Sequence, residues 1–246
     1  MPTAAILLLL GIWQAVCTFG GVPSFMLPPP AKVAETLVRE FPTLWGHARI
    51  TLVETFIGLG LGVLIGFLTA VLMDRFQPLY HAFYPLIVIS QTIPTVAIAP
   101  LLVLWFGYDM LPKVLLIILI TFFPITVNLI AGYRSADKDT INLMRSMGAG
   151  RLQIFRHVKM PCALDNFFSA LKISVSYAVV GAVIAEWLGG FNGLGVYMTR
   201  VRKSYSFSKM FAVIILISAL SLILILAVSL LQKKCMPWKK KGEQHN

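Results

Sequence analysis

Long runs without a charged residue are the feature that most constrains how this chain can fold. No Lys, Arg, Asp or Glu occurs from Thr55 to Met73, from Val114 to Tyr133 or from Met210 to Gln232. A helix that crosses a bilayer needs about 20 consecutive apolar residues, because the hydrocarbon core is about 30 Å thick. Helices satisfy their backbone hydrogen bonds internally, as a lipid environment requires. We therefore expect an all-α fold whose helices span a membrane.

The composition excludes an ordinary soluble domain. Hydrophobic residues make up 58% of the 246 residues and charged residues only 13%, whereas soluble domains contain about 25% charged residues. The net charge of +11 would suit a nucleic-acid-binding protein. The Lys and Arg residues, however, cluster in short segments between the apolar runs, which is the distribution that the positive-inside rule describes for membrane proteins.

No residue pattern in the sequence indicates catalysis. The chain lacks a Gly-x-x-x-x-Gly-Lys-Ser/Thr loop, so we expect no usual ATP site and no cofactor. Cys17, Cys162 and Cys235 show no metal-binding spacing and are interpreted as free thiols, and the four histidines are scattered. We expect neither enzymatic activity, with its catalytic residues, nor a metal site.

Six membrane spans are predicted in a single transmembrane domain that covers residues 1–246. The first, residues 3–19, is interpreted as a transmembrane helix rather than a signal peptide, because no Lys or Arg precedes Lys32. Residues 31–41 are predicted to form a short helix along the membrane surface, and residues 192–209 a polar loop. The other five spans are 55–73, 76–108, 114–133, 166–190 and 210–232.

Three glycines recur at every fourth position of the second span, namely Gly58, Gly62 and Gly66. This spacing places them on one face of a helix. Small residues on one face let two helix backbones approach closely in lipid. We therefore predict that this face packs against another span.

The third span is predicted to be broken. Residues 76–108 contain Pro78, Pro85, Pro94 and Pro100, and an interior proline removes a helical hydrogen bond and clashes with the preceding turn. We expect one helix before residues 91–95 and another after them. Irregular backbone at membrane depth is tolerated where it is buried in protein or lines a cavity. The break is either part of a substrate pathway or a kink without a role.

The distribution of basic residues predicts the orientation. With the C-terminal tail (residues 233–246) inside, twelve Lys and Arg residues lie on the cytosolic side and eight on the outer side. This is the bias that the positive-inside rule describes. Both termini and the loop of residues 135–161 are therefore expected in the cytosol.

The loop of residues 135–161, called here the 135–161 loop, is long, basic and structured. Residues 140–147 and 151–158 are both predicted to be helical, hinged at residues 148–150, with Pro161 ending the second helix. One interpretation is an elbow held to anionic lipid by its positive charge. The other is a pair of short helices inserted into the groove of a partner protein.

The residue spacing in this loop resembles a known family. Gly148 is followed after nine residues by Val158 and after one more by Met160-Pro161. This spacing is similar to the EAA loop of permease subunits of binding-protein-dependent ABC importers, which reads E-A-A, three residues, G, nine residues, I, one residue, L-P. Residues 142–144 are Asn-Leu-Met, so the glutamate of that pattern is missing here.

The likeness covers nearly the whole chain, from about residue 27 to the last span. The segments 93–107, 123–124, 131–135 and 185–188 resemble the sulfonate, taurine and nitrate branch of these permeases. Residues 185–212 are most similar to permeases for thiamine precursors of the hydroxymethylpyrimidine type. Importers of sulfonate or taurine, of nitrate and of riboflavin share much of the same sequence and stay open as alternatives.

The resemblance implies a type I ABC importer permease fold that works by alternating access. It also implies a second permease copy in a homodimer, separate ABC ATPase subunits, and an extracytoplasmic substrate-binding protein, all at the cytoplasmic membrane and in contact with lipid but not with nucleic acid. The residues it implies for contact with the ATPase are Arg145, Ser146, Met147, Gly148, Ala149, Gly150, Arg151, Phe155 and Pro161.

Polar residues inside the spans are the candidates for the substrate pathway, because such residues usually face the protein interior. Glu186 stands out as an intramembrane carboxylate: it is either a substrate or gate residue, or a structural partner of Arg200 or Arg202. The main alternative to an ABC permease is a stand-alone secondary transporter, for which charge pairs in the membrane or an inverted repeat would be expected. The predicted pathway residues are Gln91, Thr92, Thr95, Asn128, Ser174, Tyr177 and Glu186.

Overall fold

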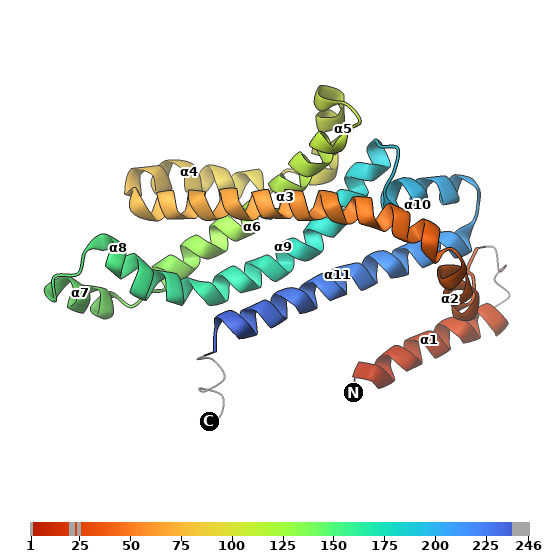
Figure 1. Ribbon diagram of the computed structural model, residues 1–246, viewed down its shortest axis with the longest axis horizontal. Coiled ribbons are helices and arrows are strands. Elements are labelled where there is room, and N and C mark those ends of the chain that lie inside the picture. Colours follow the sequence, from red (N-terminus) through yellow and green to blue (C-terminus); the bar gives the residue numbers. More distant parts are fainter. Residues whose placement is uncertain (1, 20–22, 24–25, 238–246) are drawn as a thin grey trace.

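The computed structural model describes residues 2–19, 23 and 26–237, and every regular element in this part of the chain is a helix. Long helices lie side by side, with short helices at both ends of the bundle (Figure 1). Lys239, Lys240 and Lys241 of the predicted tail lie outside the described residues. In chain order the helices are α1 (Pro2–Phe19), α2 (Pro30–Arg39), α3 (Phe41–Arg75), α4 (Gln77–Ser90), α5 (Thr95–Phe106), α6 (Met110–Arg134), α7 (Lys138–Ser146), α8 (Arg151–Ile154), the π-helical turn η1 (Phe155–Lys159), α9 (Met160–Leu188), α10 (Leu194–Lys203) and α11 (Phe207–Cys235).

Most of the predicted spans appear as long apolar helices. Four helical stretches in the described part are long and apolar enough to cross a membrane: α3, α6, the continuous helix Arg151–Leu188 and α11. The shorter apolar helix α1 touches α11 through Trp13, whose ring centroid lies 5.6 Å from that of Phe211. The all-α membrane fold is therefore confirmed, and α1 is the shortest of the predicted spans.

The predicted break in the third span is confirmed. Helices α4 and α5 meet at an angle of 97° across the residues before Thr95. Pro94 precedes α5 with an extended backbone, at φ −61° and ψ 115°, which a proline ring favours and which a continuing helix cannot accommodate. Helix α5 consequently projects away from the bundle (Figure 1).

Helix α6 lies at the centre of the bundle, between α3 and α9. The glycine face of α3 makes this packing close: a Cβ atom added at Gly58 would lie 2.5 Å from Cβ of Ile117, and one added at Gly66 would lie 3.0 Å from Cγ2 of Ile125. Real Cβ atoms essentially never come within 3.0 Å of another heavy atom, so a side chain at Gly58 would force its neighbours to move, and one at Gly66 would press tightly against Ile125. The prediction of a close packing face is confirmed.

Helix α3 begins at Phe41, well before the predicted span at residue 55. Its early turns hold buried residues, among them Leu44, Ala48 and Thr51. The charges that delimited the predicted span do not end the helix, because Glu54 is buried and paired inside the protein. Helix propagation depends on backbone geometry and packing rather than on the absence of charge.

Two further predictions about element boundaries were wrong. Pro161 does not end a helix, because it lies in the first turn of α9 and the chain is helical from Arg151 to Leu188. The π turn explains this: the Met160 N–H donates to the Phe155 carbonyl five residues earlier, so the widened turn absorbs the hydrogen bond that a proline disrupts. The predicted polar loop at 192–209 contains the helix α10, whose inner side is buried.

Candidate functional site

The 135–161 loop is a helix-turn-helix whose shape follows from its residues. Asp137 caps α7: its carboxylate accepts hydrogen bonds from the backbone N–H groups of Asp139 at 3.2 Å and Thr140 at 3.0 Å. These bonds lower the pKa of the Asp137 carboxyl below its usual value, with the hydrogen bond from the Thr140 hydroxyl as the largest cause. The carboxylate is therefore ionised at neutral pH and holds the first turn of α7 in place.

Gly148 forms the predicted hinge. Its φ is +83°, a left-handed conformation that strains residues with a Cβ. Its N–H donates to the Arg145 carbonyl at 2.9 Å, and the Ala149 N–H donates to the Met144 carbonyl at 2.9 Å. This pair of bonds is a Schellman motif, which ends a helix at a glycine. The next helix starts where the Gly150 N–H donates to Oε1 of Gln153 at 2.7 Å.

The tip of the loop exposes apolar side chains. Leu143 is 62% exposed, Met147 78% and Leu152 77%. Arg145 and Arg151 lie exposed beside them. Exposed apolar side chains rimmed by charge are typical of a surface that binds another protein.

The predicted contact residues divide between this tip and the base of the loop. Phe155 is half-buried, and its ring centroid lies 5.2 Å from that of Tyr133, so it anchors the loop to α6. Ala149 is half-buried, and Pro161 is exposed in the first turn of α9. The predicted residues that are exposed at or near the tip are Arg145, Ser146, Met147, Gly148, Gly150 and Arg151.

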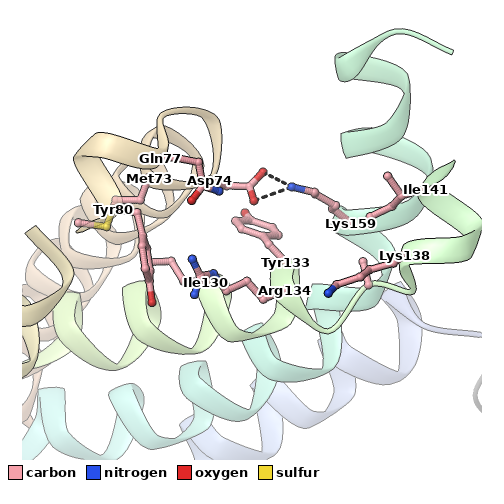
Figure 2. Close-up of a pocket in the computed structure, with 11 residues that line it drawn as sticks. Met73, Asp74, Gln77, Tyr80, Ile130, Tyr133, Arg134, Lys138, Ile141 and Lys159 are labelled. Atoms are coloured by element: carbon pink, nitrogen blue, oxygen red, sulfur yellow. Dashed lines mark hydrogen bonds and ion pairs between the residues drawn. The ribbon is translucent and has the colours of Figure 1, made fainter. Parts of the chain in front are cut away.

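One charged contact attaches the loop to α3, and a second one beside it joins α6 to α4 (Figure 2). Nζ of Lys159 lies 2.7 and 2.8 Å from the two carboxylate oxygens of Asp74, at the end of α3. The guanidinium carbon of Arg134, at the end of α6, lies 3.6 Å from the ring centroid of Tyr80 in α4. A displacement of the loop therefore acts directly on α3 through Asp74, while the contact of Arg134 with Tyr80 ties the end of α6, where the loop begins, to α4.

A cavity of about 350 Å³ lies at the break between α4 and α5, against α6 and α9. It brings together three of the predicted pathway residues, Gln91, Thr95 and Tyr177. None of the described residues that line it is charged. The wall combines one amide and three hydroxyl groups with apolar and aromatic surface: Ser90, Gln91, Ile93, Thr95, Ile98, Leu119, Ile120, Phe123, Pro124 and Tyr177.

Three other predicted pathway residues do not line this cavity. The Thr92 hydroxyl donates to the Ile89 carbonyl at 2.7 Å. The Asn128 amide donates to the Pro124 carbonyl at 2.8 Å, in the turn where that proline lies. Ser174 is buried, with its hydroxyl 3.5 Å from the Thr121 carbonyl. Their polar groups are thus satisfied by backbone carbonyls, a common arrangement in membrane helices.

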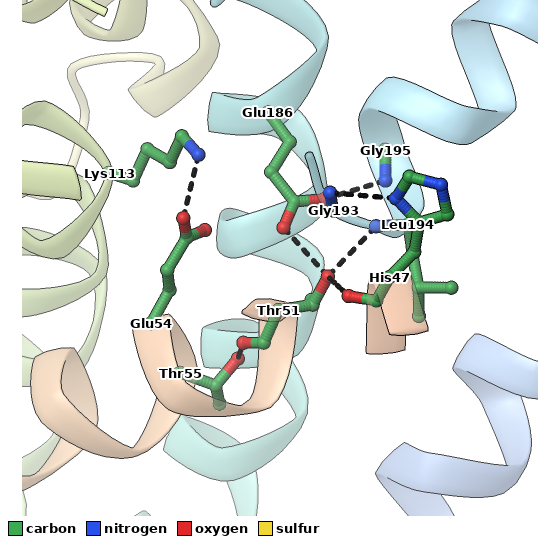
Figure 3. A network of polar contacts seen from close by, with 9 residues as sticks. All are labelled: His47, Thr51, Glu54, Thr55, Lys113, Glu186, Gly193, Leu194 and Gly195. Carbon is green, nitrogen blue, oxygen red and sulfur yellow. Dashed lines mark hydrogen bonds and ion pairs between the residues drawn. The ribbon is translucent and has the colours of Figure 1, made fainter. Parts of the chain in front are cut away.

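Glu186 does not line this cavity; it belongs to a buried polar network (Figure 3) beside α10, at the end of the bundle opposite the 135–161 loop (Figure 1). It is 2% exposed. Its Oε1 accepts from the Thr51 hydroxyl at 2.7 Å, and its Oε2 accepts from the Gly195 N–H at 2.6 Å. Since Gly195 is in the first turn of α10, the carboxylate ties α9 to both α3 and α10.

The predicted structural pairing of Glu186 with Arg200 or Arg202 was wrong. The Arg200 guanidinium donates to the Phe191 carbonyl at 2.6 Å, while Glu186 points into the bundle toward Thr51 (Figure 3). The helix α10, which the sequence did not predict, is the cause, because its N-terminal N–H groups offer the carboxylate a closer partner.

Sequence reasoning missed the ion pair beside Glu186. Nζ of Lys113 lies 2.6 Å from Oε1 of Glu54, and both side chains are almost fully buried. The available signal was the spacing of Thr51, Glu54, Thr55 and Gly58 in the sequence. Positions three and four residues apart share one helix face, and this face carries the packing glycines. Within the described ranges, no group of three or more His, Cys, Asp or Glu side chains is placed to hold a metal ion.

Comparison with known proteins relates the chain to transport. Residues 62–236 match the family described as "Binding-protein-dependent transport system inner membrane component". The chain is 37% identical over 98% of its length to the "Formylaminopyrimidine transport permease protein ThiX" of Halalkalibacterium halodurans, 96% of which is covered. It is 30% identical over 94% of its length to the "Taurine transport system permease protein TauC" of Escherichia coli, 86% of which is covered.

Solved structures share the fold. The MetNI methionine ABC transporter, in an inward-facing crystal form, contains a chain that matches with a TM-score of 0.63 at 21% identity, over 82% of this chain and 96% of that one. This likeness supports the predicted type I permease fold. Together with the family match over most of the chain and the close relatives, it shows that the protein belongs to the inner membrane components of binding-protein-dependent transport systems, the permeases of ABC importers.

Proposed function

We propose that this permease couples transport to ATP hydrolysis through the tip of its 135–161 loop and carries a small, uncharged heteroaromatic solute such as a thiamine precursor of the hydroxymethylpyrimidine type. The exposed apolar tip, with Met147 78% and Leu152 77% exposed, is the observation that supports this proposal most strongly. The tip enters a groove of a separate ATPase subunit in the cytosol. A second copy of the chain completes the permease, and an extracytoplasmic binding protein delivers the solute.

The attachment of the loop to the bundle supports this coupling. Lys159 of the loop pairs with Asp74 of α3. Arg134, the last residue of α6 before the loop, covers Tyr80 of α4. When the ATPase subunits close, the loops of the two copies move together. Because α4 leads directly into the break before α5, this movement reaches the cavity at the break and alternates its access between the two sides of the membrane.

The wall of the cavity supports the class of solute. Phe123 and Tyr177 provide aromatic surface, and Gln91 provides an amide that both donates and accepts hydrogen bonds. A pyrimidine ring can stack on such surface and bond to the amide. A sulfonate or a nitrate ion would need a cationic or multiple-donor wall, and none of the described lining residues is charged. Sulfonate, taurine, nitrate and riboflavin are the alternatives that the relatives keep open.

The exposed surface of α5 supports the second permease copy. Leu104 is 77% exposed and Trp105 is 67% exposed on a helix that projects from the bundle. A homodimer formed through this region would place the two cavities near a shared axis. The remaining exposed apolar surface contacts lipid, and both termini lie in the cytosol.

Co-purification with the ABC ATPase subunit of the same transporter tests the coupling. Met147→Glu and Leu152→Glu each place a charge in the apolar contact, so we expect the ATPase to be lost from the purified complex. Tyr205→Glu is the matched control, because Tyr205 is 77% exposed and lies between α10 and α11 at the other end of the bundle. Full retention of the ATPase by both loop variants would refute the proposed contact.

Uptake into proteoliposomes that contain the complete transporter tests the solute. We expect hydroxymethylpyrimidine to enter in an ATP-dependent manner and taurine not to compete. Gln91→Leu, which removes the amide, should raise the KM for the pyrimidine while the ATPase still co-purifies. Uptake of taurine or nitrate in preference to the pyrimidine would refute the solute but leave the coupling intact.

A further inference from the structure

A second cavity lies at the base of the 135–161 loop, and the mechanism above assigns no ligand to it. Its volume is about 160 Å³, and residues from α3, α4, α6, α7 and η1 line it (Figure 2). Three of the lining residues are cationic, Arg134, Lys138 and Lys159, and one is anionic, Asp74. The wall therefore carries an excess of positive charge.

Two of the three cations are free to bind a ligand. Lys159 is neutralised by Asp74. Among the described residues, neither Arg134 nor Lys138 has an ion-pair partner. The Arg134 guanidinium stacks on the face of Tyr80, which leaves its N–H groups at the edge available for hydrogen bonds.

A buried hydroxyl group without a partner is the second, independent observation. Tyr133 is 1% exposed, and its Oη has no hydrogen-bond partner among the described residues. Tyr133 lines this cavity, and Figure 2 places its ring beside the Asp74–Lys159 pair. A buried hydroxyl that donates to nothing is costly, and a ligand atom that accepts its proton would remove that cost.

We propose that this cavity binds a phosphate group, carried either by an anionic lipid head group or by a soluble phosphate compound. A phosphate has several acceptor oxygens, so it suits a wall that carries three donor groups, the Arg134 edge, the Lys138 ammonium and the Tyr133 hydroxyl. The volume admits several water-sized groups, which leaves space for atoms attached to the phosphate. Basic pockets between membrane helices on the cytosolic side are typical sites for lipid head groups.

Because of where the site lies, a bound ligand would affect how the 135–161 loop moves. Arg134 ends α6 and Lys138 begins α7, so a phosphate bound to both fixes the segment that joins the loop to the bundle. The same ligand would hold Arg134 against Tyr80 of α4. Binding therefore restricts movement of the loop relative to the broken span.

Binding measurements on the purified full-length protein test the site with two probes. Pyrophosphate, titrated by calorimetry in detergent, represents the soluble source. Phosphatidylglycerol, compared with phosphatidylcholine by native mass spectrometry, represents the anionic lipid source. Lys138→Gln and Tyr133→Phe each remove one donor. Lys234→Gln is the matched control, because Lys234 is exposed in the last turn of α11.

We expect each cavity variant to bind the responding probe about tenfold more weakly, as the loss of one charge-assisted hydrogen bond implies, and the control to bind it unchanged. A response to phosphatidylglycerol alone assigns the site to lipid, and a response to pyrophosphate alone assigns it to a soluble compound. Equal binding by wild type, cavity variants and control, or no binding of either probe, overturns the proposal. Loss of the ATPase from the Lys138→Gln protein without any phosphate binding also overturns it, because the cavity would then receive an acidic side chain of that partner.

Discussion

Helix α3 carries two carboxylates that each pair with a lysine, and the two pairs differ mainly in their access to water. The Glu54–Lys113 pair, 2.6 Å apart, has side chains that are 3% and 5% exposed. The Asp74–Lys159 pair, 2.7 Å apart, has side chains that are 16% and 25% exposed. The first joins α3 to α6 inside the bundle, and the second joins α3 to the base of the 135–161 loop.

This difference in burial separates a fixed end of the permease from a movable one. Separating the buried pair would leave two charges without water, which is very unfavourable. Separating the pair at the loop costs less, because both side chains are partly exposed and water can reach the separated charges. We infer that the region around Glu54 and Glu186 keeps its arrangement during transport, while the base of the loop can change its contacts.

The largest expected effect comes from removing one member of the buried pair. Lys113→Met should leave the Glu54 carboxylate buried without its partner and lower the free energy of unfolding by about 3–5 kcal/mol. Lys159→Met, the counterpart at the loop, should lower it by about 1 kcal/mol or less. Thermal unfolding of both variants in the same detergent measures the difference. Equal losses of stability would remove the distinction between the two ends.

The glycine face of α3 offers the next test, because it joins the two regions. Gly62→Ala places a Cβ against the Thr121 side chain, 3.2 Å from its Cβ and 3.3 Å from the Ile118 carbonyl. We expect a loss of about 1–3 kcal/mol, as for other overpacked sites. Gly60→Ala is the control in the same helix: nothing lies within 4 Å of its added Cβ, so the better helix propensity of alanine should keep or raise stability.

A substitution at the hinge of the loop should have the next largest effect. A side chain in a left-handed conformation costs about 1–2 kcal/mol of conformational strain. Gly148 has φ +83°, whereas Gly150 has φ −71° and an open surrounding. Gly148→Ala should therefore reduce transport coupled to ATP hydrolysis, and Gly150→Ala should leave it unchanged. Transport per ATP hydrolysed, in proteoliposomes, measures this. If both variants lost coupling, the cause would be the added methyl group in the contact with the ATPase rather than strain at the hinge.

The smallest effect concerns the cap of α7. Because hydrogen bonds lower the pKa of Asp137 in the folded protein, its carboxylate stabilises α7 above the unfolded pKa of about 4. This stabilisation is lost as the pH falls through the lowered folded value. At neutral pH the Thr140 amide should exchange more slowly in the wild type than in Asp137→Ala. Under strongly acidic conditions this difference in protection should disappear. Equal protection in wild type and Asp137→Ala at every pH would show that the cap adds nothing.

Much of the fold could be predicted from the sequence because local physical rules decide it. The break at residues 91–95 follows from the restricted backbone of proline, and the Gly58–Gly66 face follows from helical spacing. The break between the two helices of the loop is predicted at residues 148–150, and the structure places it at Gly148, whose φ of +83° only glycine adopts readily. In each case the cause lies within one element.

The candidate site could be predicted only in part, because its remaining contacts join distant elements. Thr51 and Glu186 are 135 positions apart, and Glu54 and Lys113 are 59 apart. Sequence reasoning used the charges of Glu54 and Lys113 as the limits of spans, although the two charges neutralise each other inside the bundle. Gln91, Thr95 and Tyr177 meet at one cavity. The sequence did not show which other residues line it, because that depends on how α4, α5, α6 and α9 pack together.

The π turn at residues 155–159 has a mechanical consequence. Helix Arg151–Leu188 runs 38 residues without interruption, roughly 57 Å at the usual rise. A rotation imposed on its cytosolic first turn reaches the carboxylate of Glu186 along one backbone. A π turn is wider than an α-helical turn and uncommon in long helices, so it is the point where such torsion can be taken up or released. The helix is therefore stiff along its axis but can twist at one site, the π turn.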